Sequence, residues 1–165
     1  MITPLLLLLS GFYLYNGIEY ALHKFSHSRL SGHYIHTFHM NHHIKHYPPT
    51  QLMKNSPYLA GTDTLSQKIG FFSYIPIVTM IFGSIYLIIP YDYSLIILPE
   101  NFLLIFLSDY LHQQYHTKGS WLEPYPWFQY RRNLHFKHHK VFTQNLSLGG
   151  MDYTIDKYMG SFKDL

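Results

Sequence analysis

Long apolar runs alternate with polar, histidine-rich segments along this chain of 165 residues. The first run, residues 1–17, carries no charged side chain, and neither does the run Ile69–Pro90. At a rise of about 1.5 Å per residue, the second run predicts a helix that crosses a hydrocarbon core of about 30 Å. The first run lacks a basic start and a small-residue cleavage site, so we interpret Pro4–Leu22 as a retained membrane helix and not as a signal peptide.

A third apolar run, Tyr93–Ser108, is interrupted by Pro99-Glu100. Proline inside a helix removes a hydrogen bond and clashes with the preceding turn. We therefore expect a short spanning or deeply inserted helix that starts near Glu100 and continues through Asp109 to His116.

Positive charge predicts how these helices are oriented. All 12 lysines and arginines lie in the segments 24–68 and 118–163. The positive-inside rule then predicts that both segments face the cytosol. All 13 histidines lie in these segments or at their boundary, so this topology gathers the imidazoles on one side of a membrane.

The composition excludes several classes of protein. Hydrophobic residues make up 47% of the chain and charged residues 13%, the latter about half the usual share. Without cysteine, disulfide frameworks and thiolate metal sites are excluded. A net charge of +3 without a run of lysines and arginines argues against nucleic-acid binding.

Histidines recur in four short clusters, in the order HxxxH, HxxHH, HxxxH, HxxHH. HKFSH and HMNHH precede the second apolar run, and HQQYH and HFKHH follow the third. Residues three and four apart lie on one face of a helix, so each cluster presents its imidazoles together. Neutral imidazole is the commonest side-chain metal ligand. Ten candidate ligands are too many for one ion and suit two ions: His23, His27, His39, His42, His43, His112, His116, His135, His138 and His139.

Three further histidines lie around the second cluster. His36 and His46 project onto the same helical arc as the cluster, and His33 lies further round. We interpret His36 as an additional ligand or a hydrogen-bond partner of one, and His33 and His46 as solvated or close to lipid headgroups. A loose metal-scavenging tract over residues 33–46 is an alternative, but it explains only one of the four clusters.

Two acids flank the clusters. Glu19 is four residues before His23, and Asp109 is three residues before His112. Metal-bound histidines usually donate their second N–H group to a carboxylate, a carbonyl or water, so both acids are candidates to orient the ligands. The alternative is that they only mark helix ends at the membrane interface.

The ligand set favours iron over zinc. Structural zinc sites are usually four-coordinate and rich in cysteine, and catalytic ones use three protein ligands. Imidazole also suits iron, and a pair of iron ions activates dioxygen, which redox-inactive zinc does not. We expect two iron ions as the cofactor, with zinc as a possible substitute.

The four clusters, in this order around a membrane hairpin, resemble the fatty acid hydroxylase/sterol desaturase superfamily of membrane di-iron oxygenases. EYALHKFSH is similar to its first histidine box, DYLHQQYHTKGS to its third, and NLSLGGMDYTIDKYMGS to its closing stretch. The resemblance covers about Glu19–Ser161. YPPTQLMKNSP resembles a segment of the fatty acid 2-hydroxylases, whereas sterol C4-methyl oxidases, sterol desaturases and carotenoid hydroxylases share the histidine plan.

This resemblance implies hydroxylation or desaturation of an unactivated C–H bond in a lipid, such as a fatty acyl or sphingolipid chain. It implies electrons from an external donor, a b-type cytochrome or a ferredoxin. Four basic residues, if they are exposed, would dock such an acidic donor, and contact with anionic lipid headgroups is an equal alternative for them: Arg131, Arg132, Lys137 and Lys140. A lipid would reach the site along aromatic surface such as Phe71, Phe72 and Tyr74, although ordinary lipid contact or helix packing is the favoured interpretation of each single residue. The expected location is the endoplasmic reticulum membrane in a eukaryote or the cytoplasmic membrane in a bacterium.

The predicted fold is one all-α domain over residues 1–165, an integral membrane helical bundle with a cytosolic, histidine-rich helical cap. Cap helices are expected near Gly32–His46, ended by Pro48-Pro49, and near Pro126–Lys140, and Gly149-Gly150 begins the tail. Two other functions compete with the oxygenase. One is a non-catalytic membrane metal-binding protein, and the other is a transporter, although the histidines gather at helix ends and not along a path through the bilayer.

Overall fold

The structure, a computed structural model, describes residues 4–55, 75–147 and 153–165. Within these ranges the chain is helical and forms no strand, which confirms the all-α prediction. The predicted start of the second apolar helix, with Phe71, Phe72 and Tyr74, lies outside the described residues, as does Gly149-Gly150. The described elements are α1 (Pro4–Ser26), η1 (Arg29–Ser31), α2 (His33–Asn41), η2 (His42–His46), α4 (Ile75–Ile88), α5 (Tyr91–His116), α6 (Pro126–Lys140) and α7 (Thr154–Tyr158).

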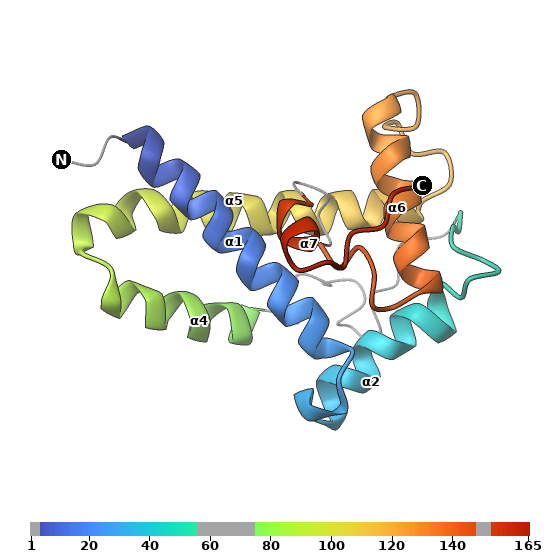
Figure 1. The fold of residues 1–165 in the computed structure, drawn as a ribbon, viewed down its shortest axis with the longest axis horizontal. Coiled ribbons are helices and arrows are strands. Elements are labelled where there is room, and N and C mark those ends of the chain that lie inside the picture. The colour runs from blue at the N-terminus through green and yellow to red at the C-terminus, as the bar shows by residue number, and fades with distance from the viewer. Residues whose placement is uncertain (1–3, 56–74, 148–152) are drawn as a thin grey trace.

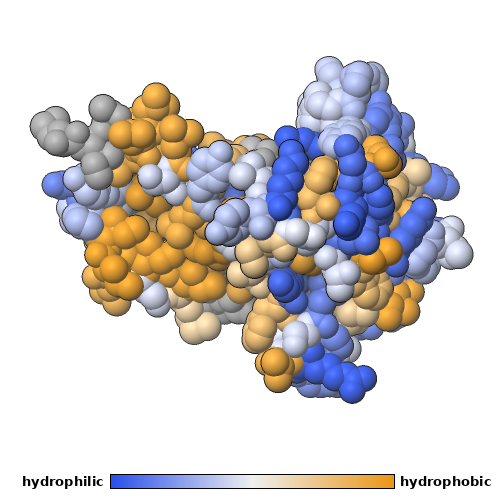
Figure 2. Space-filling view, viewed as in Figure 1, coloured by the Kyte–Doolittle hydropathy of each residue, from blue (hydrophilic) through white to orange (hydrophobic). Residues whose placement is uncertain are grey.

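The helices divide the molecule into an apolar arm and a polar end. Helices α1, α4 and α5 extend together toward the amino terminus, and α2 and α6 gather at the opposite end (Figure 1). Apolar side chains cover the arm, and polar side chains cover the end with α2 and α6 (Figure 2). Helices α1 and α5 are each long and apolar enough to cross a membrane.

A continuous buried seam joins α1 to α5. On α1 a buried position recurs at every fourth residue: Leu7, Gly11, Tyr15, Glu19 and His23. These positions face the buried side of α5, which contains Ile97, Asn101, Leu104, Ser108 and His112 and continues to His116. Spacings of three and four keep these side chains on one face of each helix. The seam starts apolar and ends in imidazole, so the packing that joins the two helices also brings their histidines together.

Pro99 lies inside α5, so the prediction of a helix that starts near Glu100 was wrong. A proline in a helix interior costs about 3 kcal/mol through the lost hydrogen bond and the clash with the preceding turn. Packing against α1 on both sides of Pro99 offsets this cost. The Asn101 side chain donates to the Ile97 carbonyl at 2.8 Å and to the Gly11 carbonyl of α1 at 3.3 Å, which fixes the helix just after the proline.

The first predicted cap helix, near Gly32–His46, changes its winding at the histidine cluster. The segment is α-helical from His33 and becomes π-helical at His42, where the Tyr47 N–H group donates to the His42 carbonyl at 2.9 Å. π-Helical turns are rare and occur frequently at functional sites. The helical segment ends at His46, just before Pro48-Pro49, as predicted. The predicted helix Pro126–Lys140 is observed as α6, with Pro126 in the first turn, where proline is favoured.

Replacing Gly11 by leucine is expected to force α1 away from α5, because a Cβ atom there would collide with Glu100 and meet the Asn101 side chain. We expect a loss of about 1–3 kcal/mol in the free energy of unfolding, as for other overpacked sites. Gly83→Leu on α4 is the matched control, since its Cβ atom meets nothing within 4 Å. Unfolding by detergent titration measures both variants; equal stability would contradict the described crossing.

Candidate metal centre

The ten predicted ligands come together as two groups of five imidazoles. The first group contains His23, His27, His39, His43 and His138, and the second contains His42, His112, His116, His135 and His139. In each group the ligand nitrogens lie within 4.8 Å of one another. Nine of the ten side chains are buried, and His27 is half-buried. The structure thus brings every predicted cluster histidine into a group with metal-binding geometry.

The two groups are built by the same rule. The HxxxH cluster of α1 belongs wholly to the first group, and that of α5 wholly to the second. Each HxxHH cluster is divided: its two histidines four residues apart join one group, and the remaining histidine joins the other. His39 and His43 therefore lie in the first group with His42 in the second, whereas His135 and His139 lie in the second group with His138 in the first. Each cap helix links the two groups.

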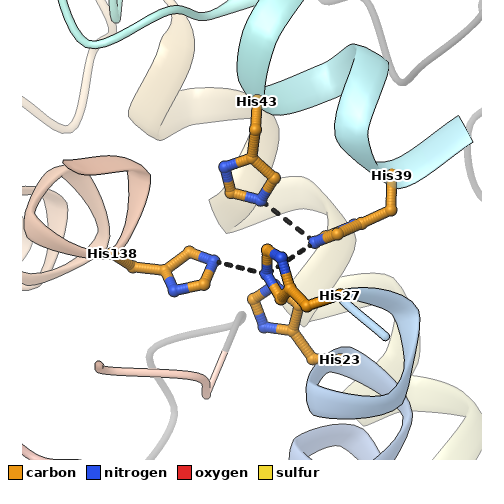
Figure 3. Close-up of side chains that lie close together, drawn as sticks. All are labelled: His23, His27, His39, His43 and His138. Atoms are coloured by element: carbon orange, nitrogen blue, oxygen red, sulfur yellow. Dashed lines mark hydrogen bonds between the residues drawn. The ribbon is translucent and has the colours of Figure 1, made fainter. Parts of the chain in front are cut away.

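The close nitrogen contacts match the edges of a coordination polyhedron. Nε2 atoms approach to 2.9 Å between His39 and His27, 3.0 Å between His43 and His39, and 3.2 Å between His27 and His138 (Figure 3). In the second group, Nε2 of His135 lies 2.9 Å from His116 and 3.1 Å from His139. Metal–nitrogen bonds of about 2.1 Å at right angles place neighbouring ligands about 3.0 Å apart. Five donors leave one position of an octahedral ion open.

Hydrogen bonds between neutral imidazoles do not account for these contacts. Each neutral ring carries one N–H group, and His138 uses its own at Nδ1, which donates to the Gln144 carbonyl at 2.8 Å. Nε2 of His27 contacts both His138 and His39, and one proton or one lone pair satisfies only one of these contacts. A cation at the centre would instead accept all the lone pairs together.

Backbone carbonyls hold the outer nitrogens of four ligands. Nδ1 of His116 lies 2.7 Å from the Leu52 carbonyl, and Nδ1 of His139 lies 2.9 Å from the Tyr47 carbonyl. Nδ1 of His23 contacts the Leu146 carbonyl in the same way, as His138 does with Gln144. Such bonds put the proton on Nδ1 and aim the Nε2 lone pair inward. The sequence did not reveal these partners, because a carbonyl has no residue-type signature.

Burial keeps the imidazoles neutral and ready to bind a metal. Burial, and then the neighbouring His138, lowers the pKa of His27 to about 3. Burial also lowers the pKa of His138 to about 4, against the opposing effect of its bond to Gln144. The pKa values of His39, His43, His135 and His139 are well below 6.5, with burial as the main cause in each case. At neutral pH these rings present lone pairs and not charge.

The two groups lie side by side. The ring centroids of His43 and His139, one from each group, are 4.1 Å apart. His42 and His43 are consecutive residues and point into different groups, as do His138 and His139. Two ions bound here would be neighbours.

The three remaining histidines fall outside both groups. His33 is exposed, as predicted. His46 is buried, with 3% of its side chain exposed, so the prediction that it is solvated was wrong. The π-helical turn is the reason, since it carries His46 inward with His42 and His43. Nδ1 of His36 lies 3.2 Å from the Ser26 carbonyl, which places His36 beside the end of α1 and not among the ligands.

The two acids occupy different surroundings. Glu19 is buried in the α1–α5 seam, where it accepts hydrogen bonds from Tyr15 at 2.9 Å and from Ser108. Asp109 is half-buried and accepts a hydrogen bond from Gln113 at 2.7 Å. Their role in orienting ligand histidines stays a prediction.

A buried aspartate, missed by the sequence analysis, organises the tail against the first group. Asp156 is fully buried and accepts hydrogen bonds from the backbone N–H groups of Leu146 at 2.7 Å and Ser147 at 2.9 Å. The hydroxyl of Ser161 donates to it at 2.7 Å. Leu146 is the residue whose carbonyl meets His23, so Asp156 fixes the position of a ligand through the backbone.

Arg132 is buried, so it does not meet the condition of exposure under which it would dock an electron donor. It is 4% exposed, pairs with Glu123 at 3.0 Å and donates to the Gln114 and Thr117 carbonyls. Arg132 therefore joins α6 to the end of α5. Lys140 is exposed.

Comparison with known proteins gave no match to a family model, a curated protein or a solved structure. The metal-binding interpretation therefore depends on the geometry of the two histidine groups.

Removing one ligand from each group is expected to empty that group alone. We expect His138→Ala and His112→Ala each to lower the transition-metal content by about one ion per chain, because each variant leaves the opposite ligand set intact. Elemental analysis of the purified protein measures the content. His33→Ala, an exposed histidine outside both groups, is the control; a similar loss in that variant would contradict the assignment.

Acid is expected to destabilise the metal-free protein. The pKa of His138 is about 4 in the folded state against 6.5 ordinarily, so the unfolded chain binds this proton first as the pH falls. The contribution of neutral His138 to the free energy of unfolding is fully present above pH 6.5 and is lost as the pH falls toward about 4. Thermal unfolding at a series of pH values measures this loss. His138→Asn should reduce the proton uptake on unfolding by about one proton, and His33→Asn should not.

Proposed function

We propose that this chain is a membrane-bound di-iron oxygenase that hydroxylates or desaturates an unactivated C–H bond of a lipid. One observation carries the proposal: two adjacent groups of five mostly buried imidazoles, each one donor short of the six ligands of an octahedral ion. A structural metal site needs no open position, whereas a catalytic one keeps a position for the reacting molecule.

Iron is the ion that this donor set supports best. Imidazole binds zinc, copper, iron and nickel, and the choice among them depends on geometry and chemistry. Five nitrogen donors with one open position suit an octahedral ion, whereas zinc in proteins is almost always tetrahedral in structural sites. When bound, two iron ions supply redox chemistry with dioxygen.

The chain itself would bind the ions, exclude water and hold the protons away from the metal-facing nitrogens. Burial of the ligands excludes water from the site, and the carbonyl bonds at Nδ1 of His116 and His139 keep Nε2 deprotonated. Hydroxylation consumes dioxygen, two electrons and two protons, and gives an alcohol and water. Desaturation consumes the same reactants and gives an alkene and two waters. The electrons come from a separate donor, such as a b-type cytochrome or a ferredoxin.

The exposed surface supports membrane insertion. Large apolar side chains are exposed along α5, and apart from the adjacent pair Phe102 and Leu103 they are spaced three, four or seven residues apart, on one face of the helix: Leu95, Phe102, Leu103, Phe106 and Tyr110. This stripe ends where the Trp121 indole N–H group donates to the Tyr110 hydroxyl at 2.7 Å. Tryptophan and tyrosine are enriched where a membrane meets water. The histidine groups would then lie at the cytosolic boundary, in the endoplasmic reticulum membrane or in the cytoplasmic membrane of a bacterium.

The histidine clusters resemble those of the fatty acid hydroxylase/sterol desaturase superfamily, and this supports a lipid substrate, such as a fatty acyl or sphingolipid chain. Within the proposal, exposed Lys140 and half-buried Arg131 and Lys137 are the candidate docking residues for an acidic electron donor.

Mössbauer spectroscopy on protein expressed with iron-57 and purified in detergent tests the proposal. We expect about two irons per chain with the signature of a coupled pair, because each imidazole group holds one ion. His139→Ala should lose one iron and the coupling. With a reductant, the native protein should also consume dioxygen.

Two results would contradict the oxygenase. Zinc alone, even after iron loading, would indicate a non-catalytic metal-binding protein. Two irons that do not react with dioxygen in the presence of a reductant would indicate metal storage and not catalysis.

A further inference from the structure

A groove along the outside of α1 runs from the apolar arm to the first histidine group. It consists of two hollows, of about 610 Å³ and 440 Å³. The two hollows adjoin, because their linings share four residues: Tyr20, Lys24, Ser28 and Met159. Volumes of about 300–1,000 Å³ are typical of sites for small molecules.

The two ends of the groove differ in chemistry. The outer hollow is lined by Gly17 and Ala21 of α1 and by Ile155 of α7, which offer an apolar surface without charge. The inner hollow ends at His27, Phe142 and Leu146. An extended apolar molecule would therefore lie against α1 and α7 and reach a metal ligand at its inner end.

The first histidine group is the accessible one of the two. His27 is half-buried and lines the inner hollow, whereas all five histidines of the second group are buried. Phe142 stacks on the His27 ring with centroids 5.3 Å apart, so an apolar side chain covers the approach to this ligand. Although the two groups follow the same ligand rule, a bound molecule meets only the first.

Among the residues that the structure describes, Lys24 is the only charged one in the lining of either hollow, and no described carboxylate lines them. The Lys24 ammonium group lies 5.7 Å from the centroid of the Tyr20 ring. A single ammonium group matches a single negative charge. A phosphate would favour the planar fork of an arginine, and none of the described lining residues is an arginine.

We propose that this groove binds a single-chain lipid with a carboxylate headgroup, held by Lys24 with its alkyl chain along Gly17, Ala21 and Ile155. The bound lipid approaches the His27 side of the first histidine group. That the lipid is then oxidised there rests on the proposed function; that it binds in this groove does not.

Photocrosslinking tests the binding site directly. The metal-free protein and the iron-loaded protein are placed in phosphatidylcholine nanodiscs with palmitate that carries a diazirine in its chain. We expect crosslinks on the groove residues Gly17, Ala21, Ile155 and Met159. Excess palmitate should remove these crosslinks. Cetyl alcohol and cetyltrimethylammonium, which have the same chain without the negative charge, should compete less well.

Two pairs of variants separate a specific groove from general contact with lipid. Gly17→Leu adds a side chain to the lining of the outer hollow, and Gly83→Leu on α4 is its control. A Cβ atom at either position meets nothing within 4 Å, so we expect both variants to fold. Crosslinking should fall in the first variant and not in the second. Lys24→Gln should weaken palmitate competition about fivefold, the worth of one partly exposed ion pair, and Lys140→Gln should not.

Crosslinks spread evenly over the exposed faces of α1 and α5, or unchanged by both Gly17→Leu and Lys24→Gln, would overturn the proposed groove. Binding in the groove by a protein that does not consume dioxygen would refute the oxygenase and leave the groove intact. Dioxygen consumption without groove crosslinks would refute the groove and leave the oxygenase intact.

Discussion

The polar half of this molecule depends on the packing of ten imidazole rings against one another in a mostly buried space. Burial removes these polar rings from water, which costs free energy, and lone pairs that face one another at the centre of a group also repel. Two cations would turn this cost into stabilisation by accepting all the lone pairs. Binding of this kind is linked to folding, because the unfolded chain does not preform the site.

Helices α1 and α5 both end at the two histidine groups. α1 and α5 pack along a seam that is apolar at Leu7 and Ile97 and becomes polar at Glu19 and Ser108, before it reaches the histidines. The cap helices α2 and α6 then close the site from the polar end (Figure 1). The apolar arm thus positions the first and third clusters, and the cap positions the second and fourth.

Chain segments without a histidine complete the centre. The carbonyls of Leu52 and Tyr47 come from the loop after η2, and those of Gln144 and Leu146 come from the loop after α6. Asp156 holds the second of these loops through backbone N–H groups. The same tail, through Ile155 and Met159, lines the groove that leads to His27, so one segment both orients a ligand and shapes the approach to it.

Sequence alone was sufficient to select the ten histidines that gather in the two groups, because the spacing of histidines on a helix fixes which side chains share a face. It misjudged Pro99, since the cost of a proline is local and the packing that offsets it is not. It also misjudged His46, whose burial depends on a π-helical turn, and it left open the exposure of Arg132, which is buried in an ion pair with Glu123. Only the tertiary structure decided that His42 and His43 serve different groups, and that one group is accessible. Those facts depend on how four helix ends meet in space, and no local pattern encodes that meeting.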